Sequence, residues 1–367
     1  MADEQVSYES VGVDYDLLDA GKRRSLAEAL LTSTLAGARG ARALDETRGE
    51  PAFVVSIGGM HLALVMECLG TKSVLARQHQ EHSGVNRFDW VGLDTVAAIV
   101  NDLCCVGALP IAVNAYFATG SAAWYQVQGR HAALIRGWRE GCELAGAVWG
   151  GGESPTLSGI IEPDEIDLAG CGLGRVPDGR LPLSGDNLRP GDEIVLVASS
   201  GIHTNGATLA RLAAERAGGL DVRLPDGTTV GDALLRPSHI YVGLLEALFA
   251  TDAEVVYASH ITGHGLRKVM RANRDLTYRV TQLPEPPPVF DFIRSTLRLS
   301  DREAFGSFNM GAGFAVYCRP GGTPAVLAAA QAAGFPAVPA GRVEAGDRKV
   351  VLEPVGIVFD SDELSLR

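Results

Sequence analysis

Short glycine-rich loops separate the apolar segments of this chain, a pattern that limits the fold to packed layers of strands and helices. Glycine supplies 44 of the 367 residues, about 12% against an average of roughly 7%, and the glycines form no repeat. In the second half of the chain, strand-like segments at 193–198 and 254–258 each lead through a glycine loop into helical segments at 207–217 and 266–272. This alternation predicts an α/β domain whose ligands bind where loops leave the strands.

The first half of the chain contains its own set of elements, so we expect two domains. An apolar strand-like segment covers 52–69, and an almost wholly apolar helix is predicted at 93–106. Further strands are expected at 111–117, 166–176 and 313–318, and further helices at 19–31, 131–147 and 324–333. The polar segment 181–190 separates an N-terminal domain, 1–178, from a C-terminal α/β domain, 179–367, as a length of about 150 residues per domain suggests.

Charge and hydropathy exclude several classes of protein. The net charge of −12 comes without a concentrated basic stripe, which argues against a nucleic-acid partner. No apolar run approaches the roughly 18 residues of a membrane span, and the acidic first residues do not resemble a signal peptide. The six cysteines form no C-x-x-C pair, so we expect reduced thiols and a cytoplasmic location, without membrane association.

Two polar motifs follow or interrupt apolar segments of the N-terminal half. Glu67 stands just before Gly70-Thr71-Lys72. Its carboxylate is a candidate cation ligand, and the hydroxyl and amine are candidates for phosphate contacts; a strand end with a solvated lysine is the alternative. Asn101-Asp102 lies inside the apolar helix, where a carboxylate is costly unless it is paired. Mg²⁺ would explain Asp102, and a salt bridge across the core is the alternative.

Four glycine-containing loops are further candidates for ligand contact. Gly150-Gly151-Gly152-Glu153 would let the backbone approach a ligand and offers a carboxylate, although such runs also form ordinary turns. The loop 199–206, which contains His203 and Asn205, precedes a helix and is a candidate anion site. The loop 260–265 contains Thr262 and two histidines, His260 and His264, but not H-E-x-x-H, so we expect a ligand loop rather than zinc. The turn at 308–313 is equally compatible with a structural role.

Taken in order along the chain, these motifs resemble the aminoimidazole ribonucleotide synthetase family, the phosphoribosylformylglycinamidine cyclo-ligases. The resemblance spans nearly the whole chain, and although each motif is weak alone, their order is highly specific. The matching segments are Tyr8-Glu9-Ser10-Val11-Gly12-Val13-Asp14, Gly70-Thr71-Lys72, Val100-Asn101-Asp102, Gly151-Gly152-Glu153, Asp167-Leu168-Ala169-Gly170, Ser200-Gly201-Ile202-His203-Thr204-Asn205-Gly206, Leu235-Arg236-Pro237-Ser238-His239-Ile240-Tyr241, His260-Ile261-Thr262-Gly263 and Phe308-Asn309-Met310-Gly311.

The resemblance implies a fold, a reaction and a set of site residues. The fold would be α/β (α+β) with two domains, and two subunits would pair through the sheets of their N-terminal domains as a homodimer. The reaction would convert formylglycinamidine ribonucleotide to aminoimidazole ribonucleotide with ATP, Mg²⁺ and K⁺, by phosphorylation of the amide oxygen and ring closure. By position, Lys72, Asp102 and His203 would be catalytic, and Glu67 and Asp102 would bind the metal. Nucleotide or substrate contacts would come from Gly70, Thr71, Asn101, Gly152, Glu153, Asn205 and Thr262.

Three differences from the family pattern keep other functions open. Glu67-Cys68-Leu69 replaces the family's Asp-Gly-Val, the glycine-rich stretch upstream is reduced to Gly58-Gly59, and His264 stands where a glycine usually follows His-Ile-Thr-Gly. A related ATP-dependent phosphotransferase with a different acceptor is one alternative. A non-catalytic paralogue is the other.

Overall fold

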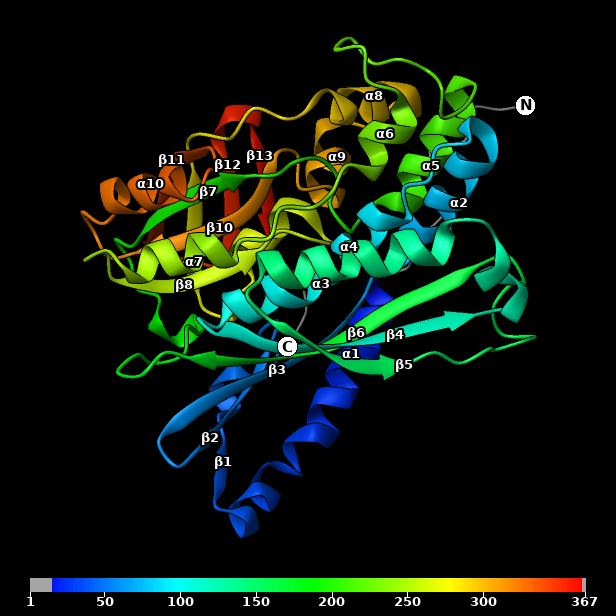
Figure 1. Ribbon diagram of the computed structural model, residues 1–367. Coiled ribbons are helices and arrows are strands. Elements are labelled where there is room, and N and C mark those ends of the chain that lie inside the picture. The colour runs from blue at the N-terminus through cyan, green and yellow to red at the C-terminus, as the bar shows by residue number, and fades with distance from the viewer. Residues whose placement is uncertain (1–14, 365–367) are drawn as a thin grey trace.

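The computed structural model describes residues 15–364, which form two sheets with helices between and around them (Figure 1). The family motif at 8–14 lies outside these residues. The N-terminal sheet has six strands in the order β1-β2-β3-β6-β4-β5, and only β4 and β5 run parallel. Its strands are β1 (Ala41–Ala43), β2 (Phe53–Ile57), β3 (Met60–Cys68), β4 (Leu109–Thr119), β5 (Val148–Glu153) and β6 (Ile166–Val176).

The described helices of the N-terminal half include one, α3, that lies between the two sheets. They are α1 (Tyr15–Leu30), α2 (Lys72–Ser83), α3 (Phe88–Cys105) and α4 (Arg130–Leu144), with short 3-10 turns at Ser33–Arg39, Asp45–Thr47 and Ala122–Gln126. α3 is buried along nearly its whole length, because it contacts β3 and β6 of one sheet and β8 (Val255–His260) of the other. A helix buried between two sheets needs apolar residues on all sides, as this helix has.

The C-terminal sheet has seven strands in the order β13-β12-β9-β11-β7-β10-β8, and only β12 and β9 run parallel. The remaining strands are β7 (Glu193–Ala198), β9 (Leu276–Val280), β10 (Ala312–Cys318), β11 (Ala337–Ala345), β12 (Lys349–Leu352) and β13 (Ile357–Asp360). Its helices are α5 (Ala207–Ala217), α6 (Val230–Leu235), α7 (Val242–Phe249), α8 (Pro288–Leu297), α9 (Asp301–Ser307) and α10 (Thr323–Ala332), with 3-10 turns at Gly185–Asn187, η6 (Gly265–Met270), Glu353–Val355 and Ser361–Glu363. Every residue of β10 is buried, so both faces of this sheet are covered.

The predicted two-domain α/β class is confirmed, with two mixed and mainly antiparallel sheets. The strands at 166–176 and 193–198 and the helix at 207–217 have the predicted bounds. The helix expected at 266–272 is wrong in type, because η6 is a 3-10 turn. Within residues 15–364, no helix is both long and apolar enough to span a membrane.

The glycine run at 150–152 lies in a strand, not in a ligand loop. β5 pairs in parallel with β4, and a Cβ atom on Gly152 would lie 2.0 Å from the carbonyl oxygen of Ala115. A Cβ on Gly150 would lie 2.5 Å from the side chain of Asn114. The close approach that these glycines permit is therefore an approach to the neighbouring strand.

Candidate active site

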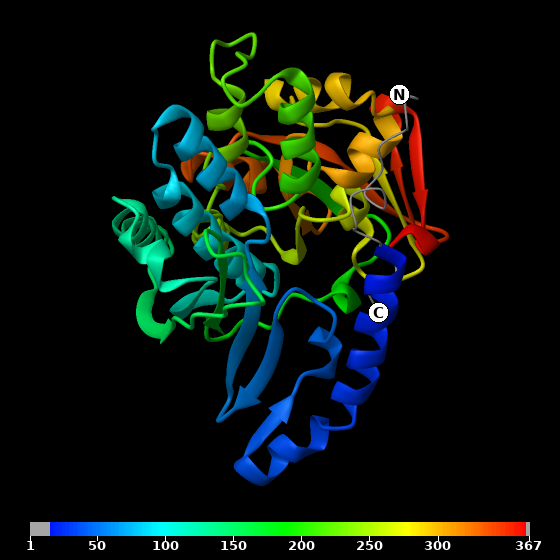
Figure 2. The same ribbon diagram turned by 90° about the vertical axis from the view of Figure 1, so that its right-hand side faces the viewer.

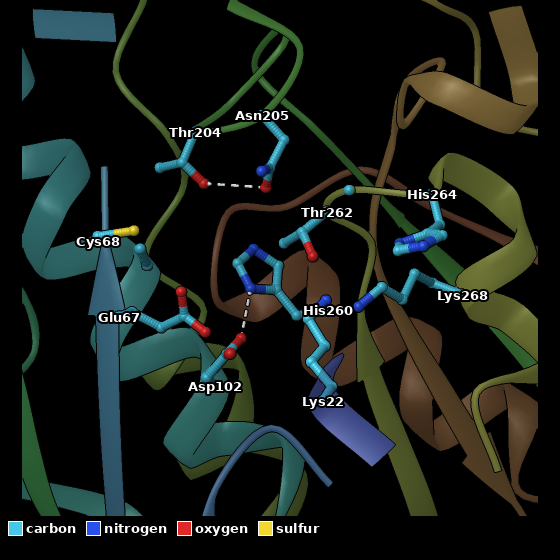
Figure 3. A pocket seen from close by; sticks show the side chains of 12 residues that line it. Lys22, Glu67, Cys68, Asp102, Thr204, Asn205, His260, Thr262, His264 and Lys268 are labelled. Atoms are coloured by element: carbon cyan, nitrogen blue, oxygen red, sulfur yellow. Dashed lines mark hydrogen bonds and ion pairs between the residues drawn. The ribbon is translucent and has the colours of Figure 1, made fainter. Parts of the chain in front are cut away.

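A polar cavity of about 210 Å³ lies where the two domains meet (Figure 3). Its wall is built from the end of β3, the second half of α3, the loops after β7 and β8, and two lysine-bearing helical turns. The lining residues are Lys22, Glu67, Cys68, Ala98, Asp102, Thr204, Asn205, His260, Thr262, Gly263, His264 and Lys268. Residues as far apart in sequence as Lys22 and Lys268 thus meet in one cavity.

Two carboxylates lie next to each other in the wall of this cavity (Figure 3). Glu67 is the last residue but one of β3, an internal strand of its sheet, and its partly buried side chain points toward Asp102 on α3 (Figure 3). Burial, followed by the negative charge of Asp102, raises the pKa of Glu67 to about 8. Burial also acts to raise the pKa of Asp102, but the hydrogen bond from His260 and the positive charges of Arg271 and Lys268 outweigh it, and the pKa is lowered. A cation placed between the two groups would relieve their repulsion.

The donor set suits a magnesium ion that also binds phosphate. No group of three or more His, Cys, Asp or Glu side chains within residues 15–364 is arranged to hold a metal by itself. Mg²⁺ does not need such a cage, because it is commonly bound by one or two carboxylates, with phosphate oxygens and water completing the shell. Glu67 and Asp102 provide that number of carboxylates.

His260 is the hydrogen-bond partner of Asp102 in the cavity wall. Its Nδ1–H donates to Asp102 Oδ1 at 2.8 Å, while its buried Nε2 has no hydrogen-bond partner among residues 15–364. The ring stands between Asp102 and Thr204 in Figure 3. A carboxylate that fixes one ring nitrogen leaves the other nitrogen oriented as a proton acceptor. The sequence identified the loop of His260, but the partner lies 158 residues away and leaves no local signal.

Two lysines supply the positive charge of the cavity. Lys268 of η6 is buried, and burial, together with Arg271, lowers its pKa to about 7 although Asp102 and Glu67 act in the opposite direction. Lys22 of α1 reaches the cavity from another wall (Figure 3). Neither lysine was among the predicted site residues, because neither stands in a recognisable motif.

Lys72 does not line the cavity. Its side chain is fully buried, and its Nζ lies 2.5 Å from Asp94 Oδ2 and donates to the carbonyl oxygens of His203 at 2.8 Å and Arg236 at 3.2 Å. All three donors of the ammonium group are therefore used within the protein. In the structure Lys72 therefore joins the start of α2 to the loop that contains His203, and its contact with phosphate stays a prediction.

Asn101 has a similar supporting position. Its Nδ2 donates to the carbonyl oxygen of His239 at 2.8 Å, and its Oδ1 accepts a hydrogen bond from the backbone N–H of Tyr241 at 2.8 Å. Both ends of the amide are thus occupied by the segment before α7. Asn101 joins α3 to the C-terminal domain, directly beside Asp102.

His203 lies behind the cavity wall, and its neighbours form the wall. Its backbone is left-handed, with φ of 57°, and its Nε2 accepts a hydrogen bond from the N–H of Ser200 at 3.1 Å. Burial, followed by the positive potential of His239, His260 and Lys72, holds the pKa of His203 well below its usual range, so the ring is neutral. Thr204 and Asn205, the next two residues, line the cavity.

The other predicted contacts lie around the cavity or away from it. Thr262 lines it. Gly70 turns the chain after β3 with φ of 69°, and the Thr71 hydroxyl lies 3.0 Å from that of Thr208 on α5. Glu153 is exposed on β5, where it accepts a hydrogen bond from the N–H of Ser154, and β6 and β4 separate it from the strand of Glu67.

Known proteins resemble this chain in both sequence and fold. The family described as AIR synthase related protein, N-terminal domain, matches residues 49–176, and its C-terminal domain matches residues 189–353. The phosphoribosylformylglycinamidine cyclo-ligase of Methanothermobacter thermautotrophicus is 35% identical over 86% of this chain and 88% of its own length. That of an Anaeromyxobacter species is 36% identical over 95% and 99%.

Structural similarity extends to more distant proteins. The structure of the hydrogenase maturation protein HypE in complex with ATP matches with a TM-score of 0.59 and 19% identity, over 81% of this chain and 83% of that chain. At this identity the likeness shows the fold. The two domain matches and the cyclo-ligase relatives together establish that the chain belongs to the AIR synthase-related family.

Proposed function

We propose that this protein cyclises formylglycinamidine ribonucleotide to aminoimidazole ribonucleotide with ATP, in the cytoplasm, as a step of purine biosynthesis. The observation that carries the proposal is convergence: the Glu67, Asp102, Asn205 and Thr262 motifs, which come from both domains, line one cavity. Relatives at about 35% identity over most of their length are named for this reaction.

The cavity suits the reacting groups rather than whole substrates. At about 210 Å³ it is smaller than the roughly 300–1,000 Å³ of sites that enclose a drug-sized ligand. We therefore propose that the terminal phosphates and the amide meet inside it, while the nucleoside and ribose parts extend outward. Mg²⁺, held by Glu67 and Asp102, would neutralise phosphate charge there.

The proposed chemistry requires positioning, charge neutralisation and one proton acceptor. Transfer of a phosphoryl group to the amide oxygen makes that oxygen a leaving group, and an amidine nitrogen then attacks the amide carbon, releasing phosphate. Lys22 and Lys268 offer positive charge, and Thr204, Asn205 and Thr262 offer hydrogen-bonding groups.

The attacking nitrogen must also lose a proton. The Nε2 of His260, oriented by the hydrogen bond between Nδ1 and Asp102, is the proposed acceptor. Lys72, Asn101 and His203 hold the wall in place in this proposal, through the buried contacts described above.

A homodimer is part of the proposal. Along β3, Ala63 and Val65 are buried under one face of the sheet, while Leu64 and Met66 on the opposite face are 48% and 76% exposed. A strand that is apolar on both faces is typical of a sheet that is covered on both sides. A second copy of the chain, paired through this face, is the cover that we propose.

Turnover of purified protein tests the reaction. Formylglycinamidine ribonucleotide, ATP, Mg²⁺ and K⁺ should yield aminoimidazole ribonucleotide, and ATP consumption should require the ribonucleotide. The altered Glu67-Cys68-Leu69 segment favours one competitor, a related phosphotransferase with another acceptor. That enzyme would bind Mg²⁺-ATP without forming aminoimidazole ribonucleotide, and a non-catalytic paralogue would not bind Mg²⁺-ATP.

A further inference from the structure

Helix α1 lies on the outside of the molecule, yet one of its residues lines the cavity (Figure 2). It runs along the side of the molecule from the C-terminal domain toward the tip of the N-terminal sheet (Figure 2). Lys22 on this helix lines the cavity, and Asp19, one turn earlier, is buried. A buried carboxylate near the beginning of a peripheral helix indicates that this end of α1 is docked against the protein.

The positive groups near the carboxylates differ in what they can offer a ligand. Lys72 is fully committed to Asp94 and two carbonyl oxygens. Arg271 donates to the carbonyl oxygen of Gly49 at 3.0 Å and lies 3.7 Å from Glu50. Lys268 forms part of the buried wall.

Lys22 differs from these groups. Its side chain is 54% exposed, and among residues 15–364 its ammonium group bonds only Asp19, at 3.2 Å. An ammonium group has three donors, so Lys22 retains the capacity to bind anionic oxygens. Figure 3 shows its side chain extending into the cavity on the side of Asp102 and Lys268.

The loop after β8 contributes a strained residue that contacts the same helix. His264 is 3% exposed and adopts φ of 70°, in the left-handed region that favours glycine. Its Nε2 lies 3.3 Å from Asp19 Oδ2. Strain at a residue that glycine would satisfy is tolerated where its side chain has a role, and the side chain of His264 meets Asp19.

We infer that α1 is part of the phosphate-binding site: Lys22 binds the terminal phosphate oxygens of the nucleotide, and the contact between Asp19 and His264 holds the helix where Lys22 reaches them. This inference rests on the proposed function, because it takes a nucleoside triphosphate as the ligand of the cavity. It gives Lys22 the role that the sequence assigned to Lys72.

Calorimetric titration with Mg²⁺ and a non-hydrolysable ATP analogue, and separately with ADP, tests this inference. Lys22→Met should raise the Kd for the analogue at least about tenfold, as expected for a lost charge-assisted hydrogen bond, and should raise that for ADP less. Arg24→Met, which removes one exposed charge from the same helix, should change neither Kd more than about twofold. His264→Gly should weaken analogue binding and speed amide hydrogen exchange in 15–30.

The outcomes separate the two proposals. If the unaltered protein binds neither nucleotide, the proposed function fails and this inference fails with it. If it binds both but Lys22→Met binds the analogue as tightly as the unaltered protein, or loses the analogue and ADP equally, the assignment of Lys22 to the terminal phosphate is overturned while the proposed function stands.

Discussion

Replacing Lys72 by methionine should destabilise the fold, because the structure makes this residue a buried tether. The side chains of Lys72 and Asp94 are both 0% exposed, and their charged atoms lie 2.5 Å apart. Lys72→Met would leave the Asp94 carboxylate buried without its partner and would remove the donor to the carbonyl oxygens of His203 and Arg236. Breaking a buried ion pair from one side costs about 3–5 kcal/mol.

The protonation of Asp94 sets the pH dependence of this loss. Burial raises the pKa of Asp94 even with Lys72 beside it, so without Lys72 the folded protein should bind a proton there more tightly than the unfolded chain does. Relative to the unaltered protein, Lys72→Met should therefore be least destabilised at low pH, and its loss of stability should grow as the pH rises through the raised pKa of Asp94. Adding Asp94→Asn keeps an acceptor for the N–H of Ser238, which donates to Asp94 Oδ1, and should recover about half of the lost free energy.

Urea unfolding followed by tryptophan fluorescence measures these changes, since Trp124 and Trp138 are buried in the N-terminal domain. The free energies of unfolding of the two single variants and the double variant complete a double-mutant cycle. If Lys72→Met unfolds within about 0.5 kcal/mol of the unaltered protein yet loses turnover, Lys72 acts on the substrates, and our reading of it as a tether is refuted.

Three further predictions concern the carboxylates and the open sheet face. Asp102→Asn should lower turnover at least about 100-fold with an unchanged circular dichroism spectrum, because the isosteric amide keeps the shape beside His260. An unchanged kcat would show that Asp102 has no part in the reaction. Because the pKa of Glu67 is raised to about 8, the metal-free protein should lose thermal stability as the pH rises from about 4.5 toward 8, and Mg²⁺ should bind more tightly over the same range. Glu67→Gln should flatten both pH profiles. Parallel profiles for Glu67→Gln and the unaltered protein would disprove the titration of Glu67 in this range. Met66→Glu on the exposed face of β3 should halve the mass measured by light scattering, whereas Leu181→Glu, at an equally exposed site off the sheet, should not; a mass independent of Met66→Glu would exclude pairing through this face.

Local sequence signals predicted the elements that local physics determines. The bounds of β7 and α5 follow from an apolar strand, a glycine loop and a helix that Gly218 ends in a left-handed conformation. Helix α3 was recognisable because apolar residues surround it, although it begins at Phe88, before the predicted position. The motif order likewise identified the loops that form the cavity.

Contacts between residues far apart in the sequence determined the features that could not be predicted from it. The partner of Lys72 is Asp94, which no spacing rule connects to it, and the amide of Asn101 is occupied by backbone groups near residue 240. Gly152 permits close approach to β4 rather than to a ligand. Lys22 has no motif at all and is recognised only by its place in the cavity wall.

The fate of the amide oxygen tests the central claim most directly. The purified protein would be given formylglycinamidine ribonucleotide carrying ¹⁸O in the formyl amide, with ATP and Mg²⁺, and the phosphate released would be analysed by mass spectrometry. We predict one ¹⁸O atom in the phosphate for each aminoimidazole ribonucleotide formed, because the oxygen leaves attached to the transferred phosphoryl group. Ring formation with unlabelled phosphate would contradict activation of the amide oxygen by phosphorylation.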